Sequence, residues 1–566
     1  MNLKEFKNII KTLFIFISLN YYLKLDCFNI MSLFIIIPIY IFIKKYNYTI
    51  NKTSRITSLI FSIFYNVGYI CELNISSKKN IFIDIFSIKN LVMFIGLYFI
   101  ILYIVSFILK ILDNAKFTSN NNFNNNKKLF LVSFIFIIIL GIPYFLATYP
   151  GLIAPDSIYQ IKQFSHLEVL TDHHPVIHTM FLKVCFKIGS LFSNDINVKS
   201  AFATIIQMLI MTAIYSYFIV FLNTQKINKK IIIILILIFG LLPVYVFYSL
   251  SMWKDVLFGG FFLIFIISIY NIINNKKIAI KNYIVFIISA LLMLLFRNNC
   301  LYMFVLFIPI YLFHFRKKII PHIISFVVIF AIFFTIKYPI YNYFNIERSK
   351  SWEYLGMPIQ QVGRMAYKDV KFTKEETKKI ENFIKISHLK EDYDPRYSDG
   401  IKFSKRLNQP YFESHNKEFL LLWKDLIIKH FDIAVESYLV STLGYWYPNI
   451  ENKAVELGVT KNDINIYNKS LLPKKATNFI NKLYNYDTPF LCLEWNLGLV
   501  IWLIGLCGII CFKKEKKYIL CYIPAIGMLA TLLLASPVNG MLRYIFWAYT
   551  TLPFYMLINS CIKKHN

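Results

Sequence analysis

Paired cysteines are missing from this sequence. Its nine cysteines include no Cys-X-X-Cys pair, and most lie in apolar segments that we expect to be helical. Such cysteines are typical of buried thiols and argue against a zinc or redox centre. The long polar segment after residue 338 has no cysteine before Cys492, so a domain formed there folds without disulfides.

Charged residues are also few, and acidic residues are the fewest. Only 16% of the residues are charged, with 31 Asp and Glu against 61 Lys and Arg, whereas 57% are hydrophobic. This composition is too apolar for a soluble domain and predicts a polytopic membrane protein, with the lipid bilayer as its surroundings. The net charge of +30 could suggest a nucleic-acid partner, but the basic residues form short clusters between apolar runs, so we expect no nucleic acid.

Apolar runs long enough to cross a bilayer recur along the chain. A membrane-spanning helix needs about 17 to 25 mostly apolar residues. We therefore predict an all-α polytopic membrane protein with a bundle of about 14 transmembrane helices. The expected spans are residues 8–23, 29–43, 56–72, 91–110, 129–147, 198–222, 231–251, 255–274, 281–296, 299–315, 319–338, 491–512, 517–535 and 541–561. No small-residue cleavage site follows the first run, which we interpret as a span and not as a signal peptide.

The basic clusters predict how the spans are oriented, because Lys and Arg near helix ends are held on the cytoplasmic side. All clusters fall on one side, together with both termini, if residues 175–192 lie along the outer membrane surface. Pro175 suits the first position of a helix, and Lys183 and Lys187 interrupt the apolar stretch. The N- and C-termini are then cytoplasmic in a plasma membrane. The later clusters are Lys226/Lys229/Lys230, Lys276/Lys277/Lys281, Arg316/Lys317/Lys318 and Lys513/Lys514/Lys516/Lys517.

This topology divides the chain into parts with different expected roles. The divisions are N-terminal spans in 1–128, a catalytic core in 129–338 with an outer loop at 148–197, an extracytoplasmic domain in 339–490, and C-terminal spans in 491–566. Helical periodicity in KEETKKIENFIKI and HNKEFLLLWKDLIIKHFDIAVESYLVSTLGYW predicts that the extracytoplasmic domain is mainly helical. The outer side also receives the short polar segments SMWKD, RNN and SPVNGMLR.

An acidic turn follows the expected span 129–147. In YPGLIAPDSIYQ, Pro150, Gly151 and Pro155 predict a turn, and Asp156 comes directly after it. A carboxylate at the membrane boundary can accept a proton or bind a metal. The alternative is that Asp156 caps a helix that begins at Ser157.

A histidine cluster lies downstream in TDHHPVIH. His174 and His178 are four residues apart, on one face of the expected surface helix, and Asp172 could orient one of the rings. This spacing suits a metal pair or a proton relay, but it lacks the Glu of HExxH. Histidines at an interface also simply hydrogen-bond to backbone or lipid headgroups, so the metal remains unknown.

Three cations stand at the outer ends of expected spans: Lys254, Arg297 and Arg543. A single cation there usually anchors its helix at the membrane surface. Because these share one side with Asp156, we hypothesise that they bind a phosphate, for which Arg offers a bidentate fork. PIQQVGR, with Gln360, Gln361 and Arg364, offers amide and guanidinium donors, or is an ordinary domain surface.

With these segments identified, the chain resembles the GT-C superfamily of membrane glycosyltransferases, and in particular uncharacterised bacterial families related to mannosyl and aminoarabinose transferases. YPGLIAPDSIYQ, HHP, WKD, RNN, PIQQVGR and SPVNGMLRY carry the resemblance over roughly residues 130–560. It implies a GT-C-like bundle with a helix along the membrane in the first outer loop, and a sugar on a polyprenyl phosphate as donor. The sequence departs from the family pattern in having further spans before the matching region and Ser157 in place of a second acidic residue. A metal-dependent mechanism therefore does not follow from the resemblance.

The resemblance implies an inverting glycosyltransferase whose acceptor belongs to the cell envelope: a polysaccharide, teichoic acid, protein or lipid. Asp156 would be the catalytic base, with His173 or His174 positioning the acceptor. The expected substrate-binding residues are Tyr149, Gln160, Lys254, Arg297, Asn298, Gln360, Gln361, Arg364 and Arg543. No cofactor is certain, and a divalent cation, Mg²⁺ or Mn²⁺, is left open.

Two other functions compete with this interpretation. A transporter or flippase of lipid-linked sugars would place ionisable residues at mid-membrane and contain related halves with broken helices, neither of which the sequence indicates. The second alternative is a non-catalytic envelope-assembly protein that retains the same scaffold.

Overall fold

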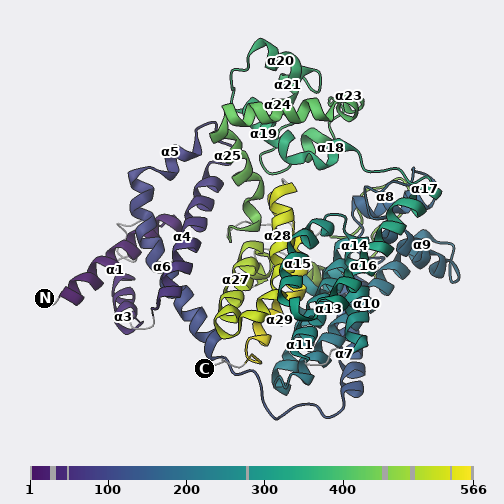
Figure 1. Cartoon of the computed structure of the whole chain (residues 1–566), viewed down its shortest axis with the longest axis horizontal. Helices are drawn as coiled ribbons and strands as arrows, with labels where there is room; N and C mark the ends of the chain where they lie inside the picture. Colours follow the sequence, from purple (N-terminus) through teal and green to yellow (C-terminus); the bar gives the residue numbers. More distant parts are fainter. Residues whose placement is uncertain are drawn as a thin grey trace. The chain divides into compact units, whose positions relative to one another are not determined.

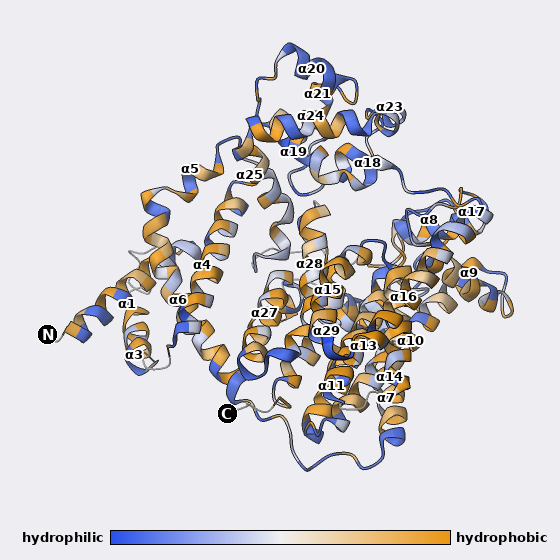
Figure 2. Ribbon diagram, in the orientation of Figure 1, coloured by the Kyte–Doolittle hydropathy of each residue, from blue (hydrophilic) through white to orange (hydrophobic). Residues whose placement is uncertain are grey.

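The computed structural model describes residues 3–25, 34–46, 50–275, 279–448, 457–484, 491–535 and 538–562. These residues form helices joined by loops, and their only β-structure consists of isolated bridges. The prediction of an all-α protein is therefore confirmed. Apolar residues cover most of the long helices (Figure 2), as expected for a multi-pass membrane protein.

Two compact units share the chain, and each contains more than one stretch of sequence (Figure 1). Unit 1 comprises residues 1–115, 351–450 and 534–540, and unit 2 comprises 116–350, 451–533 and 541–566. The segment 339–490 thus contributes to both units. The helices of unit 1 are α1 (Leu3–Tyr22), α3 (Ile36–Tyr46), α4 (Lys52–Leu73), α5 (Ile81–Ile85), α6 (Ile88–Asn114), α18 (Ser351–Tyr354), α19 (Gly356–Tyr367), α20 (Lys374–Glu381), α21 (Ile386–Asp392), α22 (Asp399–Lys402), α23 (Gln409–Ser414), α24 (Asn416–Lys429), α25 (Phe431–Thr442) and η4 (Leu443–Tyr445).

Unit 2 contains the remaining helices of the described residues. They are α7 (Asn126–Ala147), α8 (Pro155–Phe164), α9 (Val176–Ser190), α10 (Ile196–Thr224), α11 (Lys229–Leu241), α12 (Pro243–Ser249), α13 (Lys254–Asn274), α14 (Ile280–Phe296), α15 (Cys300–His314), η2 (Arg316–Lys318), α16 (Ile320–Thr335), η3 (Ile336–Ile340), α17 (Tyr341–Tyr343), α26 (Lys474–Leu483), η5 (Leu491–Trp495), α27 (Leu497–Lys514), η6 (Lys516–Cys521), α28 (Ile523–Ala535) and α29 (Leu542–Ile558). Helix α13 packs against α10, α14 and α29, and most of its surface is buried. Its N-terminal end carries Lys254.

Eight helices in the described residues are long and apolar enough to cross a membrane, or nine if a bent pair counts as one span. They are Lys52–Leu73, Ile88–Asn114, Asn126–Ala147, Ile196–Thr224, Lys254–Asn274, Ile320–Tyr343, Leu497–Lys514 and Lys516–Ala535. Two shorter apolar helices, α14 and α15, also lie at predicted spans. The expected span 29–43 lies partly outside the described residues, and the total of about 14 stays a prediction.

One predicted span is broken. Helices α11 and α12, within the expected span 231–251, meet at an angle of 54°. The cause is Pro243, which lacks a backbone N–H and disfavours a helical conformation in Leu242, whose φ and ψ are −70° and 122°. The sequence indicated no broken helix in this region, and the bend between α11 and α12 corrects that expectation.

The segment of unit 1 between Ser351 and Thr442 consists of short helices around its own apolar core. Ile359, Met365, Phe412 and Leu426 are among the buried side chains of this core. A capping box begins α20, where Thr373 and Glu376 each accept the other's backbone N–H. The predicted helical character of this segment is confirmed.

Candidate functional site

A turn in unit 2 places Asp156 beside the N-terminal end of α13. Leu152 forms a parallel bridge with Ser251, and the Ser157 hydroxyl donates to the Met252 carbonyl over 2.6 Å. Gly151, with φ of 139°, is needed in this turn, because a Cβ there would lie 2.1 Å from the Thr204 hydroxyl. The residue order YPGLIAPD thus brings Asp156 to the segment that carries Lys254.

Asp156 does not cap helix α8. The helix begins at Pro155, and the capping position is Ala154, which makes no side-chain cap. Asp156 is in the first helical turn, where the N-terminal dipole favours a carboxylate. The alternative that Asp156 caps the helix is therefore wrong. Its carboxylate instead accepts a hydrogen bond from Arg543.

Three side chains surround one oxygen of Asp156. Arg543 Nη1 donates to Asp156 Oδ2 over 2.6 Å, and Lys254 Nζ and His174 Nδ1 lie 3.9 and 4.0 Å from the same oxygen. The Asp156 side chain is 24% exposed, so it can be reached from outside the protein. Among the described residues, no donor contacts Oδ1. One carboxylate oxygen is therefore held by cations, and the other is available to a ligand.

The electrostatic balance around Asp156 favours the ionised form. Burial alone would raise the pKa of Asp156, but Arg543 and Lys254 outweigh it and hold the pKa well below its ordinary value. Burial lowers the pKa of His174 well below its ordinary value, and Lys254 lowers it further. At neutral pH the cluster thus contains one carboxylate, two cations and a neutral imidazole.

The neutral histidines orient their neighbours. Lys254 Nζ lies 3.1 Å from His174 Nδ1, and since the ammonium group can only donate, His174 is the acceptor. His178 Nδ1 lies 2.9 Å from Gln160 Oε1, so this nitrogen carries the proton, while Gln160 Nε2 donates to the Thr179 hydroxyl. Gln160, expected to bind substrate, is instead buried and hydrogen-bonded to the start of α9.

Arg297 lies in an adjoining ion pair. Its Nη1 is 3.0 Å from Asp255 Oδ1 and donates to the Tyr544 carbonyl over 2.9 Å. Its guanidinium also lies 5.3 Å from the Tyr544 ring centre, and that of Arg543 lies 4.9 Å from the same ring. Because Asp255 follows Lys254 and Tyr544 follows Arg543, Arg297 fixes the two segments that supply the cations around Asp156.

Two buried donors beside Asp156 have no acceptor among the described residues. They are Arg543 Nε and Trp253 Nε1, and the Arg543 guanidinium lies 5.2 Å from the Trp253 ring centre. Unpaired buried N–H groups are uncommon and costly. Their position beside the cations is what an anion-binding site requires.

The remaining residues expected in this site lie around it. Asn298 donates to the Asp172 carbonyl over 3.2 Å and accepts from Lys337 over 3.0 Å, and Lys337 also pairs with the Asp172 carboxylate. The rings of His173 and His174 are 4.4 Å apart. Tyr149 packs against Phe145, and none of its described contacts is with Asp156.

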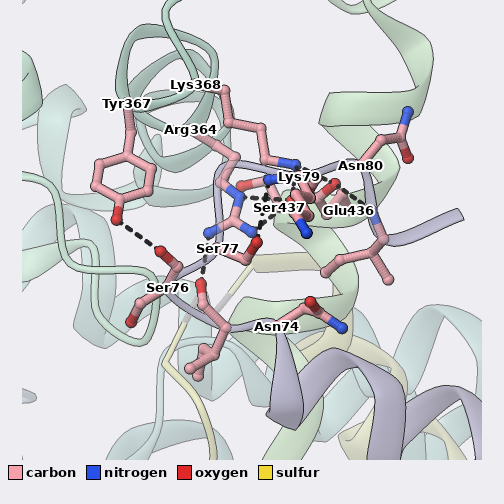
Figure 3. A network of polar contacts seen from close by, with 12 residues as sticks. Asn74, Ser76, Ser77, Lys79, Asn80, Arg364, Tyr367, Lys368, Glu436 and Ser437 are labelled. Carbon is pink, nitrogen blue, oxygen red and sulfur yellow. Dashed lines mark hydrogen bonds and ion pairs between the residues drawn. The ribbon is translucent and has the colours of Figure 1, made fainter. Parts of the chain in front are cut away.

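Gln360, Gln361 and Arg364 belong to unit 1 and form a different network. The Arg364 and Glu436 side chains are fully buried and paired, and Arg364 Nε donates to Glu436 Oε1 over 3.0 Å (Figure 3). Gln360 Nε2 donates to the Asp394 carbonyl over 2.6 Å, and Gln361 Nε2 donates to the Ala434 carbonyl over 3.0 Å. All three side chains are thus engaged by the protein itself.

Sequence reasoning did not single out Glu436, Tyr544 and Lys337. Glu436 follows no turn signal and sits in a helical pattern like its neighbours. Tyr544 could have been noticed as the residue after Arg543 in MLRY, and Lys337 as a charge at the end of an apolar run. Both signals are weak without the fold.

A divalent cation does not fit the surroundings of Asp156. The described residues contain no group of three or more His, Cys, Asp and Glu side chains arranged to hold a metal. Arg543 and Lys254 would also repel a metal cation at the carboxylate.

A family model described as a family of unknown function (DUF6020) matches residues 165–566, which is more than half of the chain. The matched range includes His174, Lys254, Arg297 and Arg543 and begins after Asp156. No curated protein and no solved structure matches the chain.

Proposed function

We propose that this chain, which belongs to the DUF6020 family, is a membrane glycosyltransferase that moves a sugar from a polyprenyl phosphate to a cell-envelope acceptor. The observation that carries the proposal is the Asp156 cluster at the end of the apolar helix α13. One oxygen of the carboxylate lies near two cations, and the other has no donor among the described residues. A base for an acceptor hydroxyl and cations for a phosphate leaving group are what this transfer needs.

In the proposed reaction, Asp156 Oδ1 accepts the proton of the acceptor hydroxyl as its oxygen attacks the anomeric carbon of the sugar. The bond between that carbon and the phosphate oxygen breaks, and the polyprenyl phosphate leaves with the bonding electrons. Arg543 and Lys254 stabilise the charge that develops on the phosphate. His174 orients the ammonium group of Lys254.

The ion pair between Arg543 and Asp156 supports an order of binding. While Arg543 and Lys254 hold the pKa of Asp156 low, its carboxylate is a weak base. A donor phosphate competes with Asp156 for the same N–H groups. When it binds, the carboxylate loses part of its stabilisation, and its basicity rises as the acceptor arrives.

The finer topology belongs to the same proposal. The active site faces the outside of the plasma membrane, both termini are cytoplasmic, and α9 lies along the surface instead of crossing it. The length of α9 supports this placement, since 15 residues are fewer than the roughly 20 that a span requires. A lipid-linked donor suits this side, because nucleotide sugars are not available there.

A transporter of lipid-linked sugars is the second candidate, and the broken pair α11 and α12 favours it. Transporters place binding sites where helices are interrupted. Here the Val244 N–H, just after the break, donates to Glu494 Oε2 over 3.2 Å. This contact places an ionisable residue beside the interruption.

Purified protein in proteoliposomes separates the two functions. A labelled polyprenyl-phosphate sugar is supplied together with a cell-envelope extract as acceptor, and both covalent products and movement across the bilayer are measured. The proposal expects label on the acceptor and free polyprenyl phosphate in equal amounts. Movement of intact donor without a covalent product would establish the transporter instead.

A further inference from the structure

A second cluster of cations in unit 2 surrounds a pocket that is separate from the Asp156 site. The pocket has a volume of about 340 Å³ and lies where α15 and η2 meet η6. Arg316, Lys317, Lys516 and Lys517 line it, and so do apolar side chains that include Phe313. We call it the basic pocket.

The described residues that line the basic pocket include four cations and no acidic side chain. None of its four cations forms an ion pair with an acidic residue in the part of the chain that the structure describes. Three of them lie against aromatic rings: the Arg316 guanidinium is 4.6 Å from the Phe313 ring centre, Lys516 Nζ is 5.6 Å from that of Phe512, and Lys517 Nζ is 5.0 Å from that of Tyr518. Four like charges around one cavity repel each other, and a bound anion would relieve that repulsion.

Position and apolar walls indicate what kind of anion fits. The apolar helices α27 and α15 end at Lys514 and His314, and new apolar segments begin at Lys516 and Ile320, so the pocket lies at a membrane boundary. Phe313 lines it and is 68% exposed. A free phosphate ion would make no favourable contact with the apolar wall. A phospholipid can place its anionic headgroup near the cations and its apolar chain against the wall.

We propose that the basic pocket binds the headgroup phosphate of an anionic phospholipid. Orientation by the positive-inside rule needs only that the basic residues be on one side, and it is satisfied equally by side chains outside the pocket. Lys318 and Lys513 are such side chains: they neighbour the pocket in sequence, are exposed and do not line it. Substitutions in the two sets of residues can therefore distinguish a specific lipid site from a general effect of positive charge.

Native mass spectrometry of the full-length protein in neutral detergent tests the proposal. Phosphatidylglycerol and phosphatidylcholine are added in turn, and the bound lipid that survives is counted. The wild type should retain phosphatidylglycerol preferentially. Arg316→Gln with Lys517→Gln should weaken that retention by roughly tenfold or more, because two contacts to the headgroup are lost. Lys318→Gln with Lys513→Gln, which removes the same charge, should leave it unchanged.

Several outcomes would overturn the lipid site. Equal losses in the two double variants would show a diffuse charge effect, and equal retention of both lipids would show that no headgroup is recognised. Stabilisation of the protein by inorganic phosphate to the same extent as by phosphatidylglycerol would identify a free anion as the ligand. If the first double variant melts lower than wild type in phosphatidylcholine alone, Lys317→Gln with Lys516→Gln replaces it.

Discussion

Two clusters of charged side chains, one in each compact unit, differ in whether protein groups occupy all of their hydrogen-bonding atoms. In unit 1, both oxygens of Glu436 accept hydrogen bonds, from Arg364, from Lys368 and from the Ile81 N–H, and the Glu436 side chain is fully buried. In unit 2, Asp156 has one oxygen in contact with cations and one without a described donor, and its side chain is 24% exposed. The first cluster is closed, and the second is open to a ligand.

The difference teaches how to separate structural from functional charge in this chain. The closed cluster joins α19 and α25 to the segment between α4 and α5, because Arg364 and Lys368 also donate to the carbonyls of Ile75 and Lys79 (Figure 3). Its charged groups all form hydrogen bonds within unit 1 and link these segments to one another. The open cluster keeps Arg543 Nε and an Asp156 oxygen without protein partners, as a site for a charged substrate would.

Breaking the closed cluster should produce the largest loss of stability. Glu436→Gln leaves Arg364 and Lys368 buried without a counter-charge, and removing one partner of a buried ion pair costs about 3–5 kcal/mol. We expect a lower melting temperature in detergent and faster proteolysis between residues 351 and 448. Arg364→Met keeps the pair of Lys368 and Glu436 and should be milder. A Glu436→Gln protein as stable as wild type would contradict the structural assignment.

Removing a cation from the open cluster should instead reduce transfer at nearly unchanged stability. Arg543→Gln removes a charged donor to the leaving phosphate, and losing one such donor lowers a rate by roughly 10²- to 10³-fold. Arg543→Lys keeps the charge but not the two-pronged guanidinium, and its transfer rate should lie between those of the wild type and Arg543→Gln. The rate is measured with the labelled polyprenyl-phosphate donor. A large drop in melting temperature with unchanged transfer would place Arg543 among the structural residues.

The pH profile should also change in Arg543→Gln. Arg543 helps to hold the pKa of Asp156 low, so before the donor binds the wild-type carboxylate stays ionised in acid. Without Arg543 the pKa of Asp156 rises, and more of the carboxylate is protonated as the pH falls. We expect a new acid limb in the variant relative to wild type. Parallel profiles would argue against Asp156 as the group that titrates.

The smallest effect is expected at His178, which joins α9 to Gln160 of α8, the helix that carries Asp156. Burial lowers its pKa to about 3 in the folded protein, whereas an unfolded histidine titrates near 6.5. The unfolded state therefore binds more protons below pH 6.5, and folding stability falls by up to about 2 kcal/mol from there to pH 5. His178→Asn, which can keep the donor to Gln160, should lessen the loss of melting temperature between pH 7 and pH 5. An unchanged loss would show that other groups dominate.

Local patterns in the sequence predicted most of the helices and the residues of the Asp156 cluster, but not how the cluster residues pair. Apolar runs placed most spans, and the turn before Asp156, together with Lys254 and Arg543 at helix ends, was visible as residue types at membrane boundaries. What could not be predicted was pairing across distant segments. Nothing near Arg364 in the sequence indicates that Glu436 would neutralise it, and nothing near Arg297 shows that Asp255 and Tyr544 would occupy it.

Transfer by Asp156→Asn is the most direct measurement of the central claim. Asparagine keeps an oxygen for Arg543 but cannot take the acceptor proton, so label transfer from the polyprenyl-phosphate sugar should fall by about 10²- to 10⁴-fold. Its melting temperature should stay closer to wild type than that of Glu436→Gln, and Asp156→Glu should recover part of the rate. Transfer by Asp156→Asn near the wild-type rate would contradict the assignment of Asp156 as the base.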